Sequence, residues 1–328
     1  MSLRTKPGRR LLKALLPVAL LLALGVGAGL FYIVRTIAHP ATHPYLVTPE
    51  TFPAYSARGL RVSEEHGSNA DGTQARGWLL RGAEGSPAVV LLHRYGADRS
   101  WLLNLGVKIN EATNYTILWP DLRGHGEHPD IAQTSFGARE TADVAAAVTF
   151  LRQLKTSQQR PLVAARFGFF GVELGAYAAL AASARAPENA TVRVLVLDSI
   201  PASPDEMLSN AIRDRMGFDN GLLNLLTRGA ARVYFLGGYE NASACDLAAQ
   251  LADKRVLLLS GEDAGNLRES TKSLAECLPR TSSVALHTDL PVTGFTASSA
   301  TGEQGETYDR LVIEFFSKAF NEDSRPAR

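Results

Sequence analysis

The residues of this chain that could carry out chemistry centre on Glu173, which lies between two glycines in the string Gly171-Val-Glu-Leu-Gly175. An apolar stretch precedes this string and an alanine-rich stretch follows it, which predicts a strand that turns sharply into a helix. In the nucleophile-elbow motif G-x-S-x-G, two glycines permit such a turn, and the middle residue projects from it above the sheet. Glutamate has no hydroxyl group to attack with. The pattern therefore predicts the elbow and argues against serine chemistry at its tip.

The elements that must position this turn alternate between strands and helices. A first pair of strands is separated by the turn signal Asn69-Ala-Asp-Gly72, and helices are predicted at 139–154, 174–185 and 307–320. The predicted strands are 60–65, 73–81, 88–92, 115–119, 163–170, 192–197, 255–259 and 284–290. Strands that alternate with helices imply a mainly parallel sheet with helices on both faces. We therefore expect one α/β domain over residues 57–322.

The N-terminal residues have the charge pattern of a membrane anchor. Residues 1–13 are basic and form a predicted cytoplasmic tail, and the run Ala14–Val34 carries no charge. That run is long enough to cross a bilayer, so we predict a transmembrane signal-anchor at 14–36 with the domain outside the cytoplasm. The alternative is a cleaved signal peptide and a secreted protein. Residues 37–56 are rich in proline and threonine and predict a linker, and residues 323–328 predict a disordered tail.

Composition excludes several partners and cofactors. The net charge is +1, and no basic cluster occurs beyond the N-terminus, so a nucleic-acid partner is not expected. Cys245 and Cys277 are the only cysteines. They could pair or simply pack, and their spacing is not that of metal ligands. We expect no metal and no cofactor. Gly25 and Gly29 form a small-xxx-small pair through which two anchors could dimerise.

Several ordered strings resemble the α/β-hydrolase superfamily, and within it the serine-aminopeptidase-like and lysophospholipase-like members. These strings are Val89-Val-Leu-Leu-His-Arg-Tyr-Gly96, Asp121-Leu-Arg-Gly-His-Gly-Glu127, Thr134-Ser-Phe-Gly137, the elbow, and Leu258-Leu-Ser-Gly-Glu-Asp263. The resemblance covers about residues 60–320 and implies the α/β-hydrolase fold. It also implies a short helical cap at about 201–250.

The resemblance assigns catalytic positions that this chain fills with other residue types. Glu173 stands where the family has its serine, and Phe295 stands where the family has its histidine. His287 is the only later histidine that follows the acid, but it lies inside a predicted strand and is a poor substitute base. The acid corresponds to Asp263, one place earlier than usual.

The resemblance also locates an oxyanion hole, formed by the backbone N–H groups of Tyr95 and Leu174. His93 and Arg94 then line the pocket, with Arg94 where the family has glycine. Because Arg94 and Glu173 are departures of opposite charge in facing loops, we predict that the two form an ion pair. The alternative is that Arg94 extends to solvent.

These departures favour a membrane-anchored α/β-hydrolase-fold protein that is catalytically degenerate. Its expected role is structural or in binding, with a small acyl or hydrophobic ligand as a candidate partner. The alternative is an active hydrolase of ester, thioester or amide bonds that uses Glu173 or a rearranged acid–histidine pair. The sequence leaves the enzymatic status open.

Overall fold

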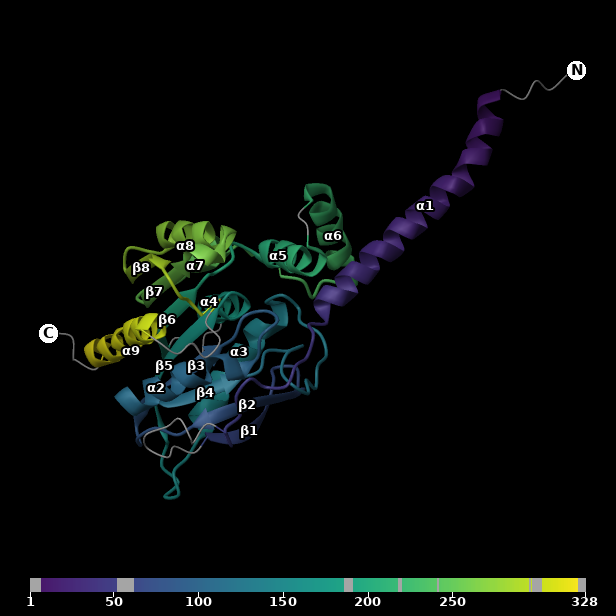
Figure 1. Ribbon diagram of the computed structural model, residues 1–328. Coiled ribbons are helices and arrows are strands. Elements are labelled where there is room, and N and C mark those ends of the chain that lie inside the picture. Colours follow the sequence, from purple (N-terminus) through teal and green to yellow (C-terminus); the bar gives the residue numbers. More distant parts are fainter. Residues whose placement is uncertain are drawn as a thin grey trace, which may run out of the picture.

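The computed structural model describes residues 7–51, 62–185, 191–217, 220–240, 242–294, 296 and 303–323. Within them, eight strands form one sheet in the order β1-β2-β4-β3-β5-β6-β7-β8 (Figure 1). Strand β2 pairs antiparallel with β1 and with β4, and every other neighbouring pair is parallel. The predicted mainly parallel sheet is therefore confirmed.

The bounds of the elements follow the alternation expected from the sequence. The strands are β1 (Val62–Ser68), β2 (Gln74–Leu80), β3 (Ser86–Leu92), β4 (Thr116–Pro120), β5 (Val163–Val172), β6 (Val192–Asp198), β7 (Arg255–Gly261) and β8 (Ser283–Leu290). The α-helices are α1 (Pro7–Ala38), α2 (Leu103–Thr113), α3 (Ala138–Gln153), α4 (Leu174–Arg185), α5 (Pro204–Met216), α6 (Gly221–Tyr234), α7 (Ala244–Ala248), α8 (Asn266–Cys277) and α9 (Glu303–Asp323). Short 3-10 turns occur at Arg99–Leu102 and Glu262–Ala264.

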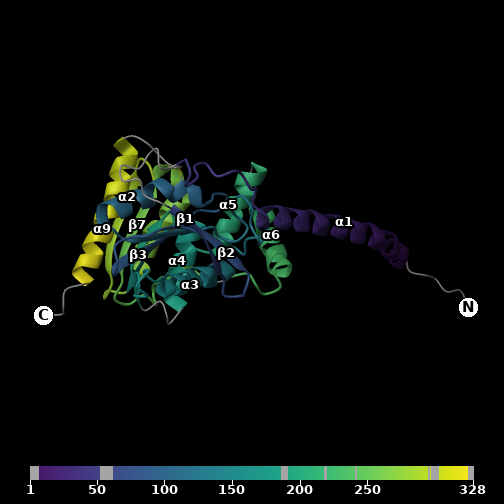
Figure 2. The same cartoon turned by 90° about the horizontal axis from the view of Figure 1, so that it is seen from below.

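The sheet is buried on both faces. Adjacent residues of a strand enter different cores: Val90 and Phe169 belong to one apolar cluster, whereas Val89 and Phe170 belong to the other. Helices α3 and α4 cover the first face, and α2 and α9 cover the second (Figure 2). Strands buried in this way read as continuous apolar runs, which is why the central strands could be predicted from the sequence.

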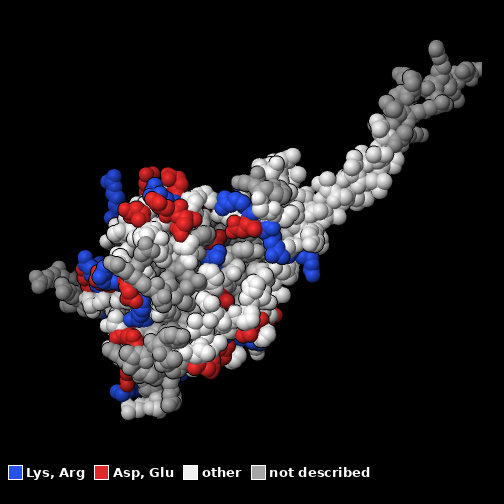
Figure 3. All heavy atoms as spheres, viewed as in Figure 1, with Lys and Arg blue, Asp and Glu red and all other residues white. Residues whose placement is uncertain are grey.

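Helix α1 has two parts with different surroundings. Side chains from Leu15 to Tyr32 are mostly exposed, and this part carries no charge (Figure 3). Further along, Val34 and Ile37 are fully buried in the first core. The stretch Leu15–Ala38 is the one described helix that is long and apolar enough to cross a membrane, a test that a signal sequence also passes.

The last turn of α1 is held by hydrogen bonds from the domain. The hydroxyl of Tyr95 donates to the carbonyl of Ile37 at 2.7 Å, and the amide of Thr134 donates to the carbonyl of Ala38 at 2.9 Å. The helix therefore ends inside the domain and not in a free segment.

The residues predicted as a linker, 37–56, are described as far as Thr51, and they pack on the domain. The Tyr45 hydroxyl donates to Asp121 at 2.7 Å, and its ring lies 5.1 Å from that of Trp78. The buried guanidinium of Arg99 lies over both rings, 4.8 and 4.5 Å from their centroids. A hydrogen bond and a cation–π contact thus hold Tyr45 on the domain, although the proline-rich composition predicted a free linker.

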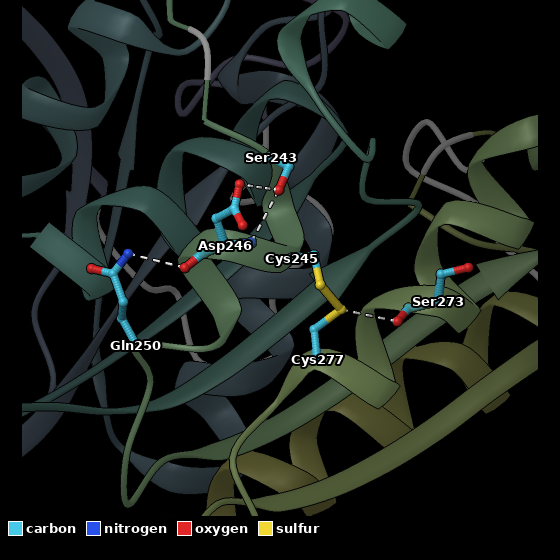
Figure 4. Close-up of a disulfide and its surroundings, with 6 residues drawn as sticks. All are labelled: Ser243, Cys245, Asp246, Gln250, Ser273 and Cys277. Atoms are coloured by element: carbon cyan, nitrogen blue, oxygen red, sulfur yellow. Dashed lines mark hydrogen bonds between the residues drawn. A yellow bond between two sulfur atoms is a disulfide. The ribbon is translucent and has the colours of Figure 1, made fainter.

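The region predicted as a cap, about residues 201–250, contains α5, α6 and α7. Helix α5 is capped by Ser203 and α6 by Asn220, whose side chains accept from the amides of Glu206 and Leu223. A disulfide joins Cys245 of α7 to Cys277 at the end of α8 (Figure 4). The pairing that the sequence left open is present, and it connects the end of the cap region to the sheet-covering helix α8.

Candidate active site

The elbow adopts the geometry that its two glycines predict. Strand β5 ends at Val172, helix α4 begins at Leu174, and Glu173 alone lies between them. Glu173 has a φ of 49°, in the left-handed region that costs a non-glycine residue about 1–2 kcal/mol. A Cβ atom on Gly171 would lie 2.5 Å from the amide of Ala176, and one on Gly175 would lie 2.3 Å from the carbonyl oxygen of Leu92. Both positions therefore require glycine.

The Glu173 side chain is turned toward the loop that follows β3. It is only 5% exposed, and its Oε2 accepts a hydrogen bond from the backbone amide of Tyr95 at 3.2 Å. Burial raises the pKa of Glu173 to about 7, although the nearby charge of Arg94 and the Tyr95 amide act to lower it. Tyr95 is one of the two predicted oxyanion donors, so the carboxylate takes a donor that a reaction intermediate would need.

Arg94 does not form the ion pair predicted for it. In the described part of the chain, the ion pairs with N···O distances up to 4.0 Å do not include Arg94 with Glu173. The guanidinium lies 4.9 Å from the centroid of the Trp101 ring and donates to the carbonyl of Tyr95 at 3.5 Å. The charge of Arg94 still acts to lower the pKa of Glu173 without an ion pair between the two side chains.

His93 and His125 form hydrogen bonds with backbone groups of the loops and not with the Glu173 carboxylate. The Nδ1 of His93 hydrogen-bonds the carbonyl of Arg94 at 2.8 Å, while its Nε2 accepts from the amide of Leu122 at 3.0 Å. His125 is placed in the same way, between the carbonyl of Arg123 and the amide of Gly96. Burial lowers the pKa of His93 to about 4 and that of His125 to about 3. Both rings are neutral with both nitrogens engaged, so neither is available as a base for the elbow.

In the described part of the chain, neither Asp263 nor His287 forms a hydrogen bond with Glu173. Asp263 is exposed in the 3-10 turn after β7, and His287 lies within β8, where it pairs in register with Leu259. Phe295, the position of the missing histidine, lies outside the described residues. Leu174 is buried at the first position of α4.

A buried acid that the sequence reasoning missed lies beside the elbow. Asp198 ends β6, and its backbone carbonyl accepts from the Glu173 amide at 3.0 Å. Its carboxylate accepts from the amide of Gly294 at 2.6 Å, from the hydroxyl of Tyr308 at 2.5 Å and from Ser199 at 2.8 Å. Burial raises its pKa to about 6 despite these donors.

Asp198 could have been found from the topology. The predicted strand 192–197 stopped one residue short of it, yet the carboxyl ends of parallel strands meet at one edge of a sheet, where sites form. Because Gly294 precedes Phe295, the hydrogen bond from Gly294 places Asp198 at the loop of the missing histidine, and the charge of Asp263 is near enough to raise the pKa of Asp198 further. No described histidine completes this arrangement.

Comparison with known proteins supports the fold. The Pyrococcus furiosus esterase Pf2001 superposes with a TM-score of 0.63 and 18% identity, covering 87% of this chain and 98% of that chain. Brefeldin A esterase, described as a bacterial homologue of human hormone-sensitive lipase, gives 0.58 and 16% identity over 90% of this chain and 86% of that chain. The α/β hydrolase GrgF from Penicillium sp. sh18 gives 0.56 and 17% identity, covering 80% and 100%.

The sequence itself matches no model of a known protein family and no curated protein. At identities this low, the structural likeness establishes the fold alone. The chain has the α/β-hydrolase fold, as the ordered motifs of its sequence implied.

Proposed function

We propose that this chain is a membrane-anchored α/β-hydrolase-fold protein whose catalytic site is degenerate and whose role is structural or in binding. The observation that carries the proposal is the hydrogen bond from the Tyr95 amide to the Glu173 carboxylate. An oxyanion hole accelerates acyl transfer because its donors are free to meet charge that develops in the transition state. Here the Glu173 carboxyl group already accepts a hydrogen bond from one of these donors.

The surroundings of the elbow support the same conclusion. His93 and His125 use both ring nitrogens in holding loops, and Glu173 is buried. A general base must reach the proton that it removes, and no described side chain does so at the elbow. A small acyl or hydrophobic ligand would need the space that the Glu173 carboxylate occupies, so binding there requires the carboxylate to move.

One observation favours the alternative, a hydrolase that acts through Glu173. Burial raises the pKa of this carboxyl to about 7, where a general acid or base is most effective near neutral pH. The degenerate protein is expected to show no turnover, whereas a hydrolase that acts through Glu173 should lose its turnover when Glu173 is replaced.

The test uses the full-length protein in detergent, treated with a fluorophosphonate and with a panel of ester, thioester and amide substrates. We expect no labelling and no hydrolysis above the Glu173→Gln variant, which keeps the shape and removes the charge. A serine hydrolase of known activity serves as the positive control. Labelling of the wild type would overturn the proposal, and turnover that Glu173→Gln abolishes would establish the alternative.

The proposed topology places the domain outside the cytoplasm. The basic tail precedes the uncharged run, and the Cys245–Cys277 disulfide is the kind of bond that persists in oxidising compartments. Protease added to intact cells should degrade the domain and spare the basic tail. A protected domain would contradict the orientation, and a domain released into the medium would indicate a cleaved signal peptide.

A further inference from the structure

Helix α6 carries two apolar faces where a surface helix in water would carry one. Its inner face, which includes Leu223, Ala230 and Ala231, packs against the first core. Its outer face forms a continuous row of exposed apolar side chains, which we call the outer stripe: Leu222, Leu225, Leu226, Val233 and Leu236, the last of these just beyond the helix. A helix exposed to water on one side places polar residues on that side. The outer stripe therefore indicates a different surrounding.

The exposed fractions of these side chains are large. Val233 is 72% exposed and Leu236 is 88% exposed, while Leu222 and Leu225 are each 65% exposed. The polar residues of α6 lie in a separate row and are directed to α5: Arg228 donates to Ser209, and Arg232 pairs with Asp205 at 3.1 Å. The polar row thus contacts α5, with Arg232 still partly exposed, and the apolar row faces outward.

The position of α6 relative to α1 indicates what covers the stripe. The two helices are in contact, and the ring of Phe31 lies 5.6 Å from that of Tyr234 near the end of α6. Both views show α6 beside the end of α1 that enters the domain (Figures 1 and 2). The outer stripe is therefore continuous with the exposed apolar surface of α1.

The length of the exposed part of α1 fixes where a bilayer would end. Leu15 to Tyr32 spans about 27 Å at about 1.5 Å per residue, close to the ~30 Å hydrocarbon core of a bilayer. Because Val34 and Ile37 are buried in the domain, the membrane must end near Ile33, which is the level at which Tyr234 contacts α1. No free segment separates the domain from the bilayer.

Cations at this level fit the polar edge of a membrane. Arg35 is exposed on the last turn of α1, and Arg139 is exposed beside the end of α6. Arg139, Tyr234 and Phe235 line a hollow of about 440 Å³ next to Leu236. Arginine and aromatic residues are common at the level of the lipid headgroups of a bilayer.

We propose that α6 is an interfacial membrane helix, whose outer stripe inserts among the acyl chains of the same bilayer that α1 enters. The domain then contacts the membrane at two places, a spanning helix and a helix lying at the surface. This inference rests on the proposed anchoring by α1. It adds a lipid-binding surface that the anchor alone does not require.

The test reconstitutes the full-length protein in liposomes with either ordinary or brominated acyl chains, which quench tryptophan on contact. Leu225→Trp and Val233→Trp report on the outer stripe, with the wild-type signal of the three native tryptophans subtracted. Leu21→Trp, in the middle of α1, reports the anchor. Leu286→Trp is the matched control, because it replaces another exposed leucine, 42% exposed, on β8.

We expect brominated lipid to reduce the added fluorescence of both stripe variants and of Leu21→Trp, and to leave that of Leu286→Trp unchanged. Quenching at Leu21 without quenching at the stripe would leave the anchor standing and overturn this inference. Absence of quenching at Leu21 as well would overturn the anchoring itself. If the stripe tryptophans are instead shielded from aqueous acrylamide but not quenched by lipid, a second copy covers the stripe and the lipid assignment is wrong. Near-ultraviolet circular dichroism confirms that each variant is folded.

Discussion

Two buried glutamates of this protein have opposite surroundings. Glu140, in the first turn of α3, is fully buried and accepts from the Thr134 hydroxyl at 2.6 Å, the Ser135 amide at 2.8 Å and the Gly137 amide at 2.9 Å. The Ser135 hydroxyl is a fourth donor. For Glu173 the described residues supply one donor, the Tyr95 amide.

The difference shows that the residue type alone does not determine what a buried carboxylate does. Taking a carboxylate out of water costs several kcal/mol unless hydrogen bonds or charges replace the water. The loop 134–137 donates hydrogen bonds to Glu140 in place of water, so this carboxylate stabilises the fold. Glu173 receives little, in a strained turn, so the elbow keeps it at a cost in stability.

The largest expected effect is at Glu140. Glu140→Ala leaves buried amides and hydroxyls of the 134–137 loop without their acceptor, and each such group costs about 1–3 kcal/mol. We expect the free energy of unfolding to fall by at least about 3 kcal/mol. Denaturant unfolding of the full-length protein in detergent measures it. Glu173→Ala is the matched comparison, and an equal loss in both variants would remove the distinction between the two sites.

The second largest expected effect is a gain in stability on replacing Glu173, and its size depends on pH. The Glu173 carboxyl loses its proton near pH 4.5 when unfolded and near pH 7 when native, so the native state holds the extra proton between those values. Stability therefore falls as the pH rises from about 4.5 to 7, by on the order of 3 kcal/mol.

Glu173→Gln has no proton to lose, so we expect it to be more stable than the wild type at pH 8 and to have a much smaller advantage at pH 5. Thermal unfolding at both pH values measures the difference. Glu140→Gln should show no gain at pH 8. An advantage of Glu173→Gln that is the same at both pH values would contradict the assigned ionisation.

The smallest effect concerns the contact between the loop that follows β3 and α1. Tyr95→Phe keeps the backbone amide that binds Glu173 and removes the hydroxyl that binds the Ile37 carbonyl. One hydrogen bond contributes about 1 kcal/mol, so we expect a loss of that size with the pH dependence unchanged. A change in the pH profile would show that the hydroxyl, and not the amide alone, supports the Glu173 carboxylate.

The sequence predicted the sheet and the elbow because both depend on local patterns. Apolar runs identify strands buried on both faces, and a pair of glycines around one residue identifies the turn. Asp198 was missed because its place beside the elbow depends on the pairing of β6 with β5, which brings its carbonyl oxygen to the amide of Glu173. The predicted Arg94–Glu173 pair did not form, and the guanidinium stacks on Trp101, a residue outside the motifs from which the pair was predicted.

Other features also depended on contacts that the sequence cannot show. The family resemblance implied a helical cap at about 201–250, and only the structure shows that α6 is apolar on two sides. The proline-rich segment after α1 predicted a linker. In the structure, Tyr45 binds Asp121 and stacks under Arg99, which fixes the segment on the domain. The composition of a segment indicates how flexible its backbone is, but it does not show which residues elsewhere in the chain bind the segment.

The buried last turn of α1 has a consequence for how the domain could meet other molecules. A domain on a long flexible tether searches a hemisphere of solution, with a reach set by the tether. Here Val34 and Ile37 are part of the core, so the domain and the last turn of α1 move as one body. If α1 crosses the membrane as proposed, the domain stays next to the bilayer at a fixed height, and a tilt of the helix reorients every surface of the domain.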